Sequence, residues 1–270
     1  MFSKMEAGKM MSVAELLRRG FYSMAFQPIY DTASLVPFGF EALLRGPAGT
    51  PLANPGKVFG DGCSLADELL FELDMACVGS AVRTGRRLPG KSLIFINIHG
   101  GTAPRLAEEA KDLLKLLRDL GVEPSRVVFE VSEGASQESL NETAENLKVF
   151  RREGVKVALD DVGSRHPWLH HMLWLEPDFI KLDRTLISGI DTCEKKQALT
   201  QGLSFLARQM KSRVVAEGVE TRQEMQALRL LDVPLAQGFL LGRPMRADNW
   251  RGICGEPEAE AATAPLWLYT

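Results

Sequence analysis

Acidic and amide side chains recur at the ends of predicted strands along most of this 270-residue chain. They are Glu41, Asn97, Glu130, the adjacent Asp160 and Asp161, and Glu217, and Gln237 opens a turn on the last predicted strand. Carboxylate and amide oxygens are the ligands that Mg²⁺ and Mn²⁺ prefer over the nitrogen and sulfur ligands of zinc. So many carboxylates gathered at one place would repel one another unless cations lay among them. The pattern therefore predicts a centre for divalent cations.

The pair Asp160 and Asp161 suggests two cations rather than one. Neighbouring carboxylates can serve two ions roughly 3.5–4 Å apart, the separation used for in-line displacement at phosphorus. Lys181, on another predicted strand, would then orient or acidify the attacking water. This combination indicates hydrolysis of a phosphate ester.

A structural explanation competes with each assignment. A single strand-end Asp or Glu is more often a helix cap or a surface ion pair, and only the repetition on successive strands favours a metal site. Lys181 alone could be a snorkelling surface lysine, and Asp183 either lines the site or caps the segment that follows it. We expect the four histidines to lie on loops or helix surfaces rather than on the metal; they are His99, His166, His170 and His171.

Eight predicted strands alternate with helical patterns and would position these side chains. The strands are Phe26–Tyr30, Pro37–Leu43, Leu93–Asn97, Arg126–Val131, Val155–Asp160, Asp178–Asp183, Arg213–Glu217 and Leu235–Leu240. Leucines at three- and four-residue spacing predict a helix over Arg105–Leu120, and Ser139–Glu153 reads as another, with Ser139 or Asn141 as its cap. This alternation predicts an α/β protein with a (β/α)8 TIM-like barrel, whose functional sites lie at the carboxyl ends of the strands.

We expect one barrel domain over residues 21–250, a lead-in over residues 1–20 and a tail over residues 251–270. The tail is acidic from Glu256 to Pro265, and the apolar residues 266–269 at its end could dock onto the barrel. The net charge of −3 and pI near 5.9 argue against a DNA or RNA partner held by bulk electrostatics. The chain shows no run of about 18 apolar residues and no secretion signal, and scattered cysteines suit a reducing compartment. We therefore expect a cytoplasmic protein with no membrane contact through this chain.

Short blocks along the chain also carry a resemblance to a known family. They are Phe26–Ile29, Gly39–Arg45, Ile96–Ile98, Glu130–Glu133, Ala158–Asp161, Phe179–Asp183, Val215–Thr221 and Gln237–Pro244. In this order, and from about Phe21 to Met245, the sequence resembles the EAL-domain cyclic di-GMP phosphodiesterases. The resemblance implies a barrel whose first strand is antiparallel to the rest. It also implies metal-dependent hydrolysis of cyclic di-GMP to the linear dinucleotide pGpG, and a possible homodimer.

By the same resemblance, each strand-end residue has a role. Two ions, Mg²⁺ or Mn²⁺, would be bound by Glu41, Asn97, Glu130, Asp160, Asp161 and Glu217. The catalytic residues would be Lys181, Glu217 and Glu41. Substrate would be bound by Gln27, Leu43, Arg45, Asp183 and Gln237. Glu133 and Glu220 would anchor the loop that follows the aspartate pair.

That loop, residues 162–168, departs from the family pattern. Arg165 replaces a glycine and Pro167 is introduced, and both residues restrict the backbone more than the residues they replace. The departure supports an alternative function, a catalytically inactive cyclic di-GMP receptor or a module that binds a protein signalling partner. An unrelated metal-dependent barrel phosphoesterase is the third possibility.

Overall fold

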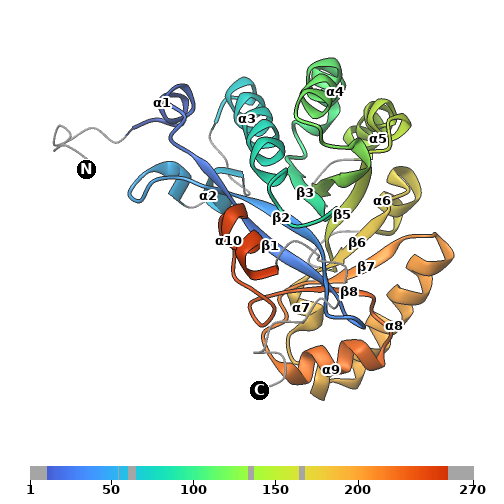
Figure 1. Cartoon of the computed structure of the whole chain (residues 1–270). Coiled ribbons are helices and arrows are strands. Elements are labelled where there is room, and N and C mark those ends of the chain that lie inside the picture. Colours follow the sequence, from blue (N-terminus) through green and yellow to red (C-terminus); the bar gives the residue numbers. More distant parts are fainter. Residues whose placement is uncertain (1–10, 54, 60–64, 133–136, 164–167, 255–270) are drawn as a thin grey trace.

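The computed structural model describes residues 11–53, 55–59, 65–132, 137–163 and 168–254. Eight strands close into one barrel, in which each strand pairs with its neighbours in sequence and β8 pairs with β1. Figure 1 shows the helices placed around this barrel. The predicted (β/α)8 TIM-like barrel is therefore confirmed.

The first strand runs against all the others. β1 is antiparallel to both β2 and β8, while every pair from β2 to β8 is parallel. Ser23 at the start of β1 lies opposite Arg45 at the end of β2, so the first strand begins at the mouth where the others end. The strands are β1 (Ser23–Asp31), β2 (Pro37–Arg45), β3 (Leu93–Ile98), β4 (Val127–Ser132), β5 (Lys156–Val162), β6 (Phe179–Leu182), β7 (Arg213–Ala216) and β8 (Leu235–Gln237).

Helices and short 3-10 turns connect the strands and cover the barrel. The helices are α1 (Val13–Arg18), α2 (Pro55–Phe59), α3 (Asp67–Gly85), α4 (Ala110–Asp119), α5 (Gln137–Arg152), α6 (Trp168–Leu175), α7 (Arg184–Ile187), α8 (Glu194–Gln209), α9 (Arg222–Leu230) and α10 (Ala247–Cys254). The 3-10 turns are Pro51–Ala53, Ala103–Glu109, Pro124–Arg126 and Ile190–Thr192. Among the helices of the described residues, none is both long enough and apolar enough to cross a membrane.

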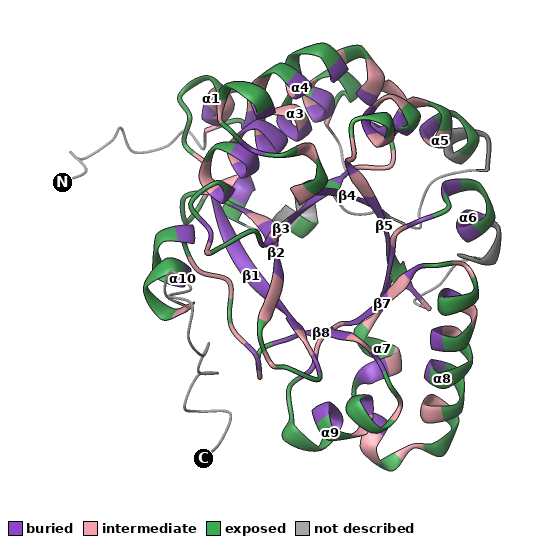
Figure 2. Cartoon of the chain, turned by 45° about the vertical axis from the view of Figure 1, so that its right-hand side comes forward, coloured by how far each residue is buried: buried purple, intermediate pink, exposed green. Residues whose placement is uncertain are grey.

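Alternation along the strands divides the core into two layers. Side chains on the inner face fill the barrel, and they are Ile29, Phe95, Val128, Ala158, Phe179, Val215 and Leu235. Residues between them point outward and join the larger layer under the helices. Figure 2 shows the consequence, a ring of buried strands enclosed by helices whose outer faces are exposed.

Several predicted boundaries were wrong. The last strand ends at Gln237 rather than Leu240, because the chain turns at Gly238. The helix expected from Arg105 begins as a 3-10 turn at Ala103, with Pro104 in its first turn, and becomes α-helical only at Ala110. α5 begins at Gln137, so Ser139 and Asn141 lie inside the helix and do not cap it. Glutamine and glutamate at 137 and 138 are good helix formers, which accounts for the earlier start.

Candidate metal centre

Lys181 of β6 lies at the centre of the barrel mouth. Only 1% of its side chain is exposed, and four carboxylates from four other strands or strand ends surround its ammonium. The distances from Nζ are 2.8 Å to Glu130 Oε1, 2.8 Å to Glu217 Oε1, 3.1 Å to Asp160 Oδ1 and 3.6 Å to Glu41 Oε2. The alternative of a snorkelling surface lysine is therefore wrong, because the buried ammonium points into the mouth.

One ammonium does not balance the charge of this cluster. Burial lowers the pKa of Lys181, but the four carboxylates outweigh that effect and raise it well above its usual value. Burial, with repulsion from Asp160 and Glu41, raises the pKa of both Glu130 and Glu217 well above the usual range. Oxygen Oε2 of Glu130 is buried with no hydrogen-bond partner among the described residues. The site therefore has more buried negative charge than the protein itself neutralises, which suits bound cations.

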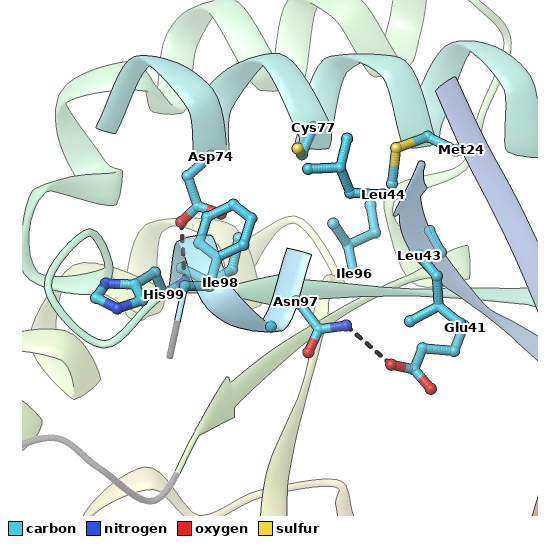
Figure 3. Close-up of a pocket in the computed structure, with 13 residues that line it drawn as sticks. Met24, Glu41, Leu43, Leu44, Asp74, Cys77, Ile96, Asn97, Ile98 and His99 are labelled. Atoms are coloured by element: carbon cyan, nitrogen blue, oxygen red, sulfur yellow. Dashed lines mark hydrogen bonds between the residues drawn. The ribbon is translucent and has the colours of Figure 1, made fainter. Parts of the chain in front are cut away.

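Two amides hold Glu41 of β2 in place. Asn97 Nδ2, from β3, donates to Glu41 Oε1 at 2.9 Å, as Figure 3 shows. Gln237 Nε2, from β8, donates to Glu41 Oε2 at 2.6 Å and also contacts Gln27 Oε1 of β1 at 3.2 Å. Burial raises the pKa of Glu41, but Lys181 and these amides outweigh burial and lower it. Glu41 is thus held as a carboxylate, and donors on three strands fix the orientation of its oxygens.

A break in β5 brings the adjacent aspartates to the same side. In a regular strand, Asp160 and Asp161 would point to opposite faces. The pairing of β5 with β6 is irregular between Leu159 and Val162, and Asp161 adopts a left-handed backbone with φ of 58°. Oxygens of Asp160, Asp161 and Glu217 consequently lie within 4.8 Å of one another. Burial, with repulsion from Asp160, raises the pKa of Asp161 to about 6.

The other predicted site residues lie around this cluster or apart from it. Arg45 is exposed at the end of β2, where its guanidinium donates to the Leu44 carbonyl at 2.8 Å. Asp183 accepts from Thr185 N at 2.8 Å and caps α7, which is the structural role left open for it. Glu220 pairs with Arg184 at 3.0 Å. Glu133 and most of the loop 162–168 fall outside the described residues.

Two cavities meet at Glu41. One, of about 340 Å³, opens over Asp160, Asp161 and Glu217 and is bordered by Arg184 and Phe239. The other, of about 330 Å³, lies between β2, β3 and α3 (Figure 3) and is lined by Leu43, Asp74 and His99 among others. Sequence reasoning missed Arg184, Phe239 and Asp74 as lining residues. Arg184 and Phe239 lie two residues past the ends of β6 and β8, and Asp74 lies on α3, so none of them is an acidic or amide residue at a strand end.

The histidines take no part in the acidic cluster, as far as the structure describes them. His99 is half-buried and lines the second cavity, where its Nδ1 accepts from Gly101 N at 3.0 Å. His171 is buried on α6. The side chains of His166 and His170 lie outside the described residues. The expected ligand set of oxygen atoms therefore needs no imidazole.

The fold is a closed β/α barrel, and its carboxylates gather around a buried lysine. The protein is therefore a barrel protein with an acidic site at the carboxyl ends of its strands. Within that class the sequence is specific: the model of the EAL domain family matches residues 10–244. The chain belongs to the EAL domain family.

Curated relatives agree with this assignment. A signaling protein of Caulobacter vibrioides is 30% identical over 246 residues, which are 87% of this chain and 29% of that protein. The cyclic di-GMP phosphodiesterase NbdA of Pseudomonas aeruginosa is 28% identical over 236 residues, 86% of this chain and 30% of NbdA. The chain thus spans about three tenths of the length of these relatives.

Solved structures agree as well. BlrP1 of Klebsiella pneumoniae, in complex with manganese and cyclic di-GMP, is 30% identical with a TM-score of 0.75, covering 84% of this chain and 57% of BlrP1. The PaMucR phosphodiesterase in complex with cyclic di-GMP is 25% identical with a TM-score of 0.75, covering 88% of this chain and 97% of that chain.

Proposed function

We propose that this domain hydrolyses cyclic di-GMP at the mouth of its barrel, with divalent cations bound by the acidic cluster. One observation carries the proposal, the convergence of Glu41, Glu130, Asp160 and Glu217 on the buried Lys181. NbdA is named as a cyclic di-GMP phosphodiesterase, and BlrP1 was solved with manganese and cyclic di-GMP, which supports the same substrate and ion class here.

The charge of the cluster favours two ions, Mg²⁺ or Mn²⁺. Its carboxylates are Glu41, Glu130, Asp160, Asp161 and Glu217, and Lys181 is the ammonium among them. Five negative charges and one positive charge leave an excess of four, which two divalent cations neutralise. The ligands would be these carboxylates and the amide oxygen of Asn97, all of them oxygen atoms of the kind that such ions prefer. Bound ions would supply Lewis-acid stabilisation of the phosphate and lower the pKa of a water molecule.

The side chains of the chain itself have distinct roles in this proposal. Lys181 donates to the attacking water and, with Glu217 and Glu41, fixes its position against the phosphorus. Water oxygen bonds to phosphorus while the bond from phosphorus to the 3′ oxygen breaks, and the leaving oxygen takes up a proton, which gives linear pGpG. Gln27 and Gln237 hold Glu41 in place through their amide chain. Arg45 and Leu43 would contact the substrate beyond the reacting group.

The test is turnover measured by chromatography of the nucleotides. The chain is incubated with cyclic di-GMP and Mn²⁺ or Mg²⁺, next to the PaMucR phosphodiesterase as an active reference. We expect linear product from the parent chain and at least a hundredfold slower reaction from Glu217→Gln. Glu153→Gln is the matched control, because Glu153 is an exposed residue in the turn before the start of β5, on the side of the barrel opposite the mouth.

A receptor function remains the second candidate because of Arg165 and Pro167 in the loop after the aspartates. Calorimetry with cyclic di-GMP and Ca²⁺, followed by the turnover assay in Mn²⁺, separates the two. Tight binding without product would replace the phosphodiesterase proposal with a receptor. Absence of both binding and product would leave only a protein-interaction role.

A further inference from the structure

The face of the barrel opposite the acidic mouth contains a pocket of about 590 Å³. We call it the floor pocket, since it is lined by residues at the starts of strands: Pro37 of β2, Leu93 of β3, Lys156 of β5, Phe179 of β6 and Arg213 of β7. Phe179 belongs to the inner layer of the barrel, and Phe38 packs against it edge-on with ring centroids 5.8 Å apart. The pocket therefore has an aromatic base, formed by the buried Phe179 and the partly exposed Phe38.

Cationic groups surround this apolar base. Lys91, Lys156 and Arg213 line the pocket, and its lining within the described part of the chain includes no Asp or Glu. Arg213 stacks on Phe38 at 4.4 Å and has a partner in Asp31 at 3.6 Å. Neither Lys91 nor Lys156 forms an ion pair with a described residue. The floor pocket thus presents two unpaired ammonium groups next to aromatic surface, which suits an acidic segment that also carries aromatic residues.

The chain itself supplies such a segment next to the pocket. Cys254, the last residue of α10, lines the floor pocket. The following residues, 255–270, have Glu256, Glu258 and Glu260 near their start and Trp267 and Tyr269 near their end, with no Lys or Arg. Along the chain after Cys254, the acidic residues therefore come first and the aromatic residues last.

We propose that residues 255–270 bind in the floor pocket of their own chain, with the glutamates beside Lys91 and Lys156 and the aromatic end on Phe38. The reach is sufficient: Glu256 and Glu260 follow Cys254 by two and six residues, which extended backbone spans in at most about 7 and 20 Å. Pro257 and Pro265 favour such extended backbone over a longer α10. Val36, 38% exposed, adds apolar surface at the rim.

Binding in trans tests the proposal. A fluorescein-labelled peptide of residues 255–270 is titrated, with anisotropy as the readout, into a chain that ends at Cys254 and into the intact chain. We expect the shortened chain to bind the peptide and the intact chain to bind it at least tenfold more weakly. The tethered segment would compete at an effective concentration near millimolar. Equal affinity for the two chains, or no binding to the shortened chain, would overturn the proposal.

Charge variants locate the binding site. In the shortened chain, Lys91→Glu with Lys156→Glu should weaken peptide binding at least tenfold. Lys195→Glu, on the exposed surface of α8, is the matched control and should leave the affinity unchanged. A peptide with glutamine at positions 256, 258 and 260 should bind with at least tenfold lower affinity. A peptide with Trp267→Ala should also bind more weakly. Loss of affinity in the control variant to the same extent would argue against the floor pocket.

Two further measurements complete the test. Should the shortened chain fail to fold, the intact chain with Glu256→Gln, Glu258→Gln and Glu260→Gln takes its place, and it should bind the peptide more tightly than the parent does. Light scattering then shows whether the segment in the floor pocket comes from the same chain or from a second copy. An intact chain that is dimeric, and becomes monomeric on removal of residues 255–270, would show that the segment binds a second copy and would overturn binding within one chain.

Discussion

Lys181 keeps together carboxylates that would otherwise separate or take up protons. Four of them contact its ammonium in a buried site, where a lone charge is costly. The position of Lys181 and its neighbours at strand ends could be predicted from the sequence, because the carboxyl ends of barrel strands meet at one mouth. Their contacts with the lysine could not, since the choice of partner among five carboxylates depends on side-chain distances that no spacing reveals.

Replacement of Lys181 by methionine should destabilise the metal-free protein. In EDTA at pH 8, urea unfolding should show a loss of about 3–5 kcal/mol, the cost of breaking a buried ion pair. The loss should be smaller at pH 5. Without the lysine ammonium the carboxyl groups have higher pKa values, so more of them are protonated and uncharged at that pH. Lys148→Met, in an exposed pair with Glu145, is the control and should change stability by less than about 1 kcal/mol. Equal stability of Lys181→Met and parent at pH 8 would contradict the central role of the lysine.

Asp74 of α3 should make stability depend on pH. Burial raises its pKa to about 7 although His99 N donates to it at 2.9 Å, while the unfolded value is 3.8. The folded state therefore holds this proton more tightly, and stability falls as pH rises from about 4 to 7 and levels off above. Asp74→Asn should remove this fall, so its advantage over the parent should grow by up to about 4 kcal/mol across that window.

Urea unfolding at steps between pH 4 and pH 8.5 checks the Asp74 prediction. The matched control is Asp112→Asn, on the exposed face of α4, whose stability should run parallel to that of the parent at every pH. A constant difference between Asp74→Asn and the parent from pH 4 to pH 8.5 would show that Asp74 does not titrate in this range.

At the scale of elements, strand order was predictable and local breaks in the strands were not. The alternation of apolar β-branched runs with helical periodicity predicts strands within a few residues of β1 to β8. The irregular pairing after Leu159 and the left-handed Asp161 leave no mark in this pattern, because aspartate occurs both in regular strands and in left-handed positions. The antiparallel β1 came from the family resemblance alone.

Gly238 controls how closely the ends of β7 and β8 approach. A Cβ at this position would overlap the backbone of Val219, whose N–H donates to the Gln237 carbonyl at 3.0 Å. We expect Gly238→Ala to cost about 1–3 kcal/mol in urea unfolding, the usual cost of overpacking. It should also weaken Mn²⁺ binding in calorimetry, because Gln237 and its bond to Glu41 would shift.

Gly202 is the control for the substitution at Gly238. It lies on the exposed face of α8, where a Cβ added to it would have open space around it. Gly202→Ala should therefore stabilise the chain by about 0.5–1 kcal/mol, because alanine is the better helix former. Similar effects of the two substitutions would mean that the contact with Val219 does not set the approach of the strands.

The whole molecule should respond to metal as one unit, because the proposed ligands come from strands around the entire barrel. An ion that binds only the folded state raises stability by about 2.7 kcal/mol at one hundred times its dissociation constant. We therefore expect Mn²⁺ to raise the melting temperature of the parent. Glu217→Gln should lose most of this increase, and an unchanged increase would count against the cluster as the metal site. Assembly into a homodimer and a protein signalling partner stay predictions.

The direction of β1 has a consequence for anything attached to the barrel. Because Ser23 begins its strand beside Arg45, β1 begins on the side of the acidic mouth, whereas Cys254 at the end of α10 lies on the opposite side, at the floor pocket. A sensory module fused before Met11 would lie close to the acidic mouth, so a small movement of that module could change access to the site. The same module fused after α10 would lie at the opposite end of the barrel, so its effect on the mouth would have to pass along the length of the strands.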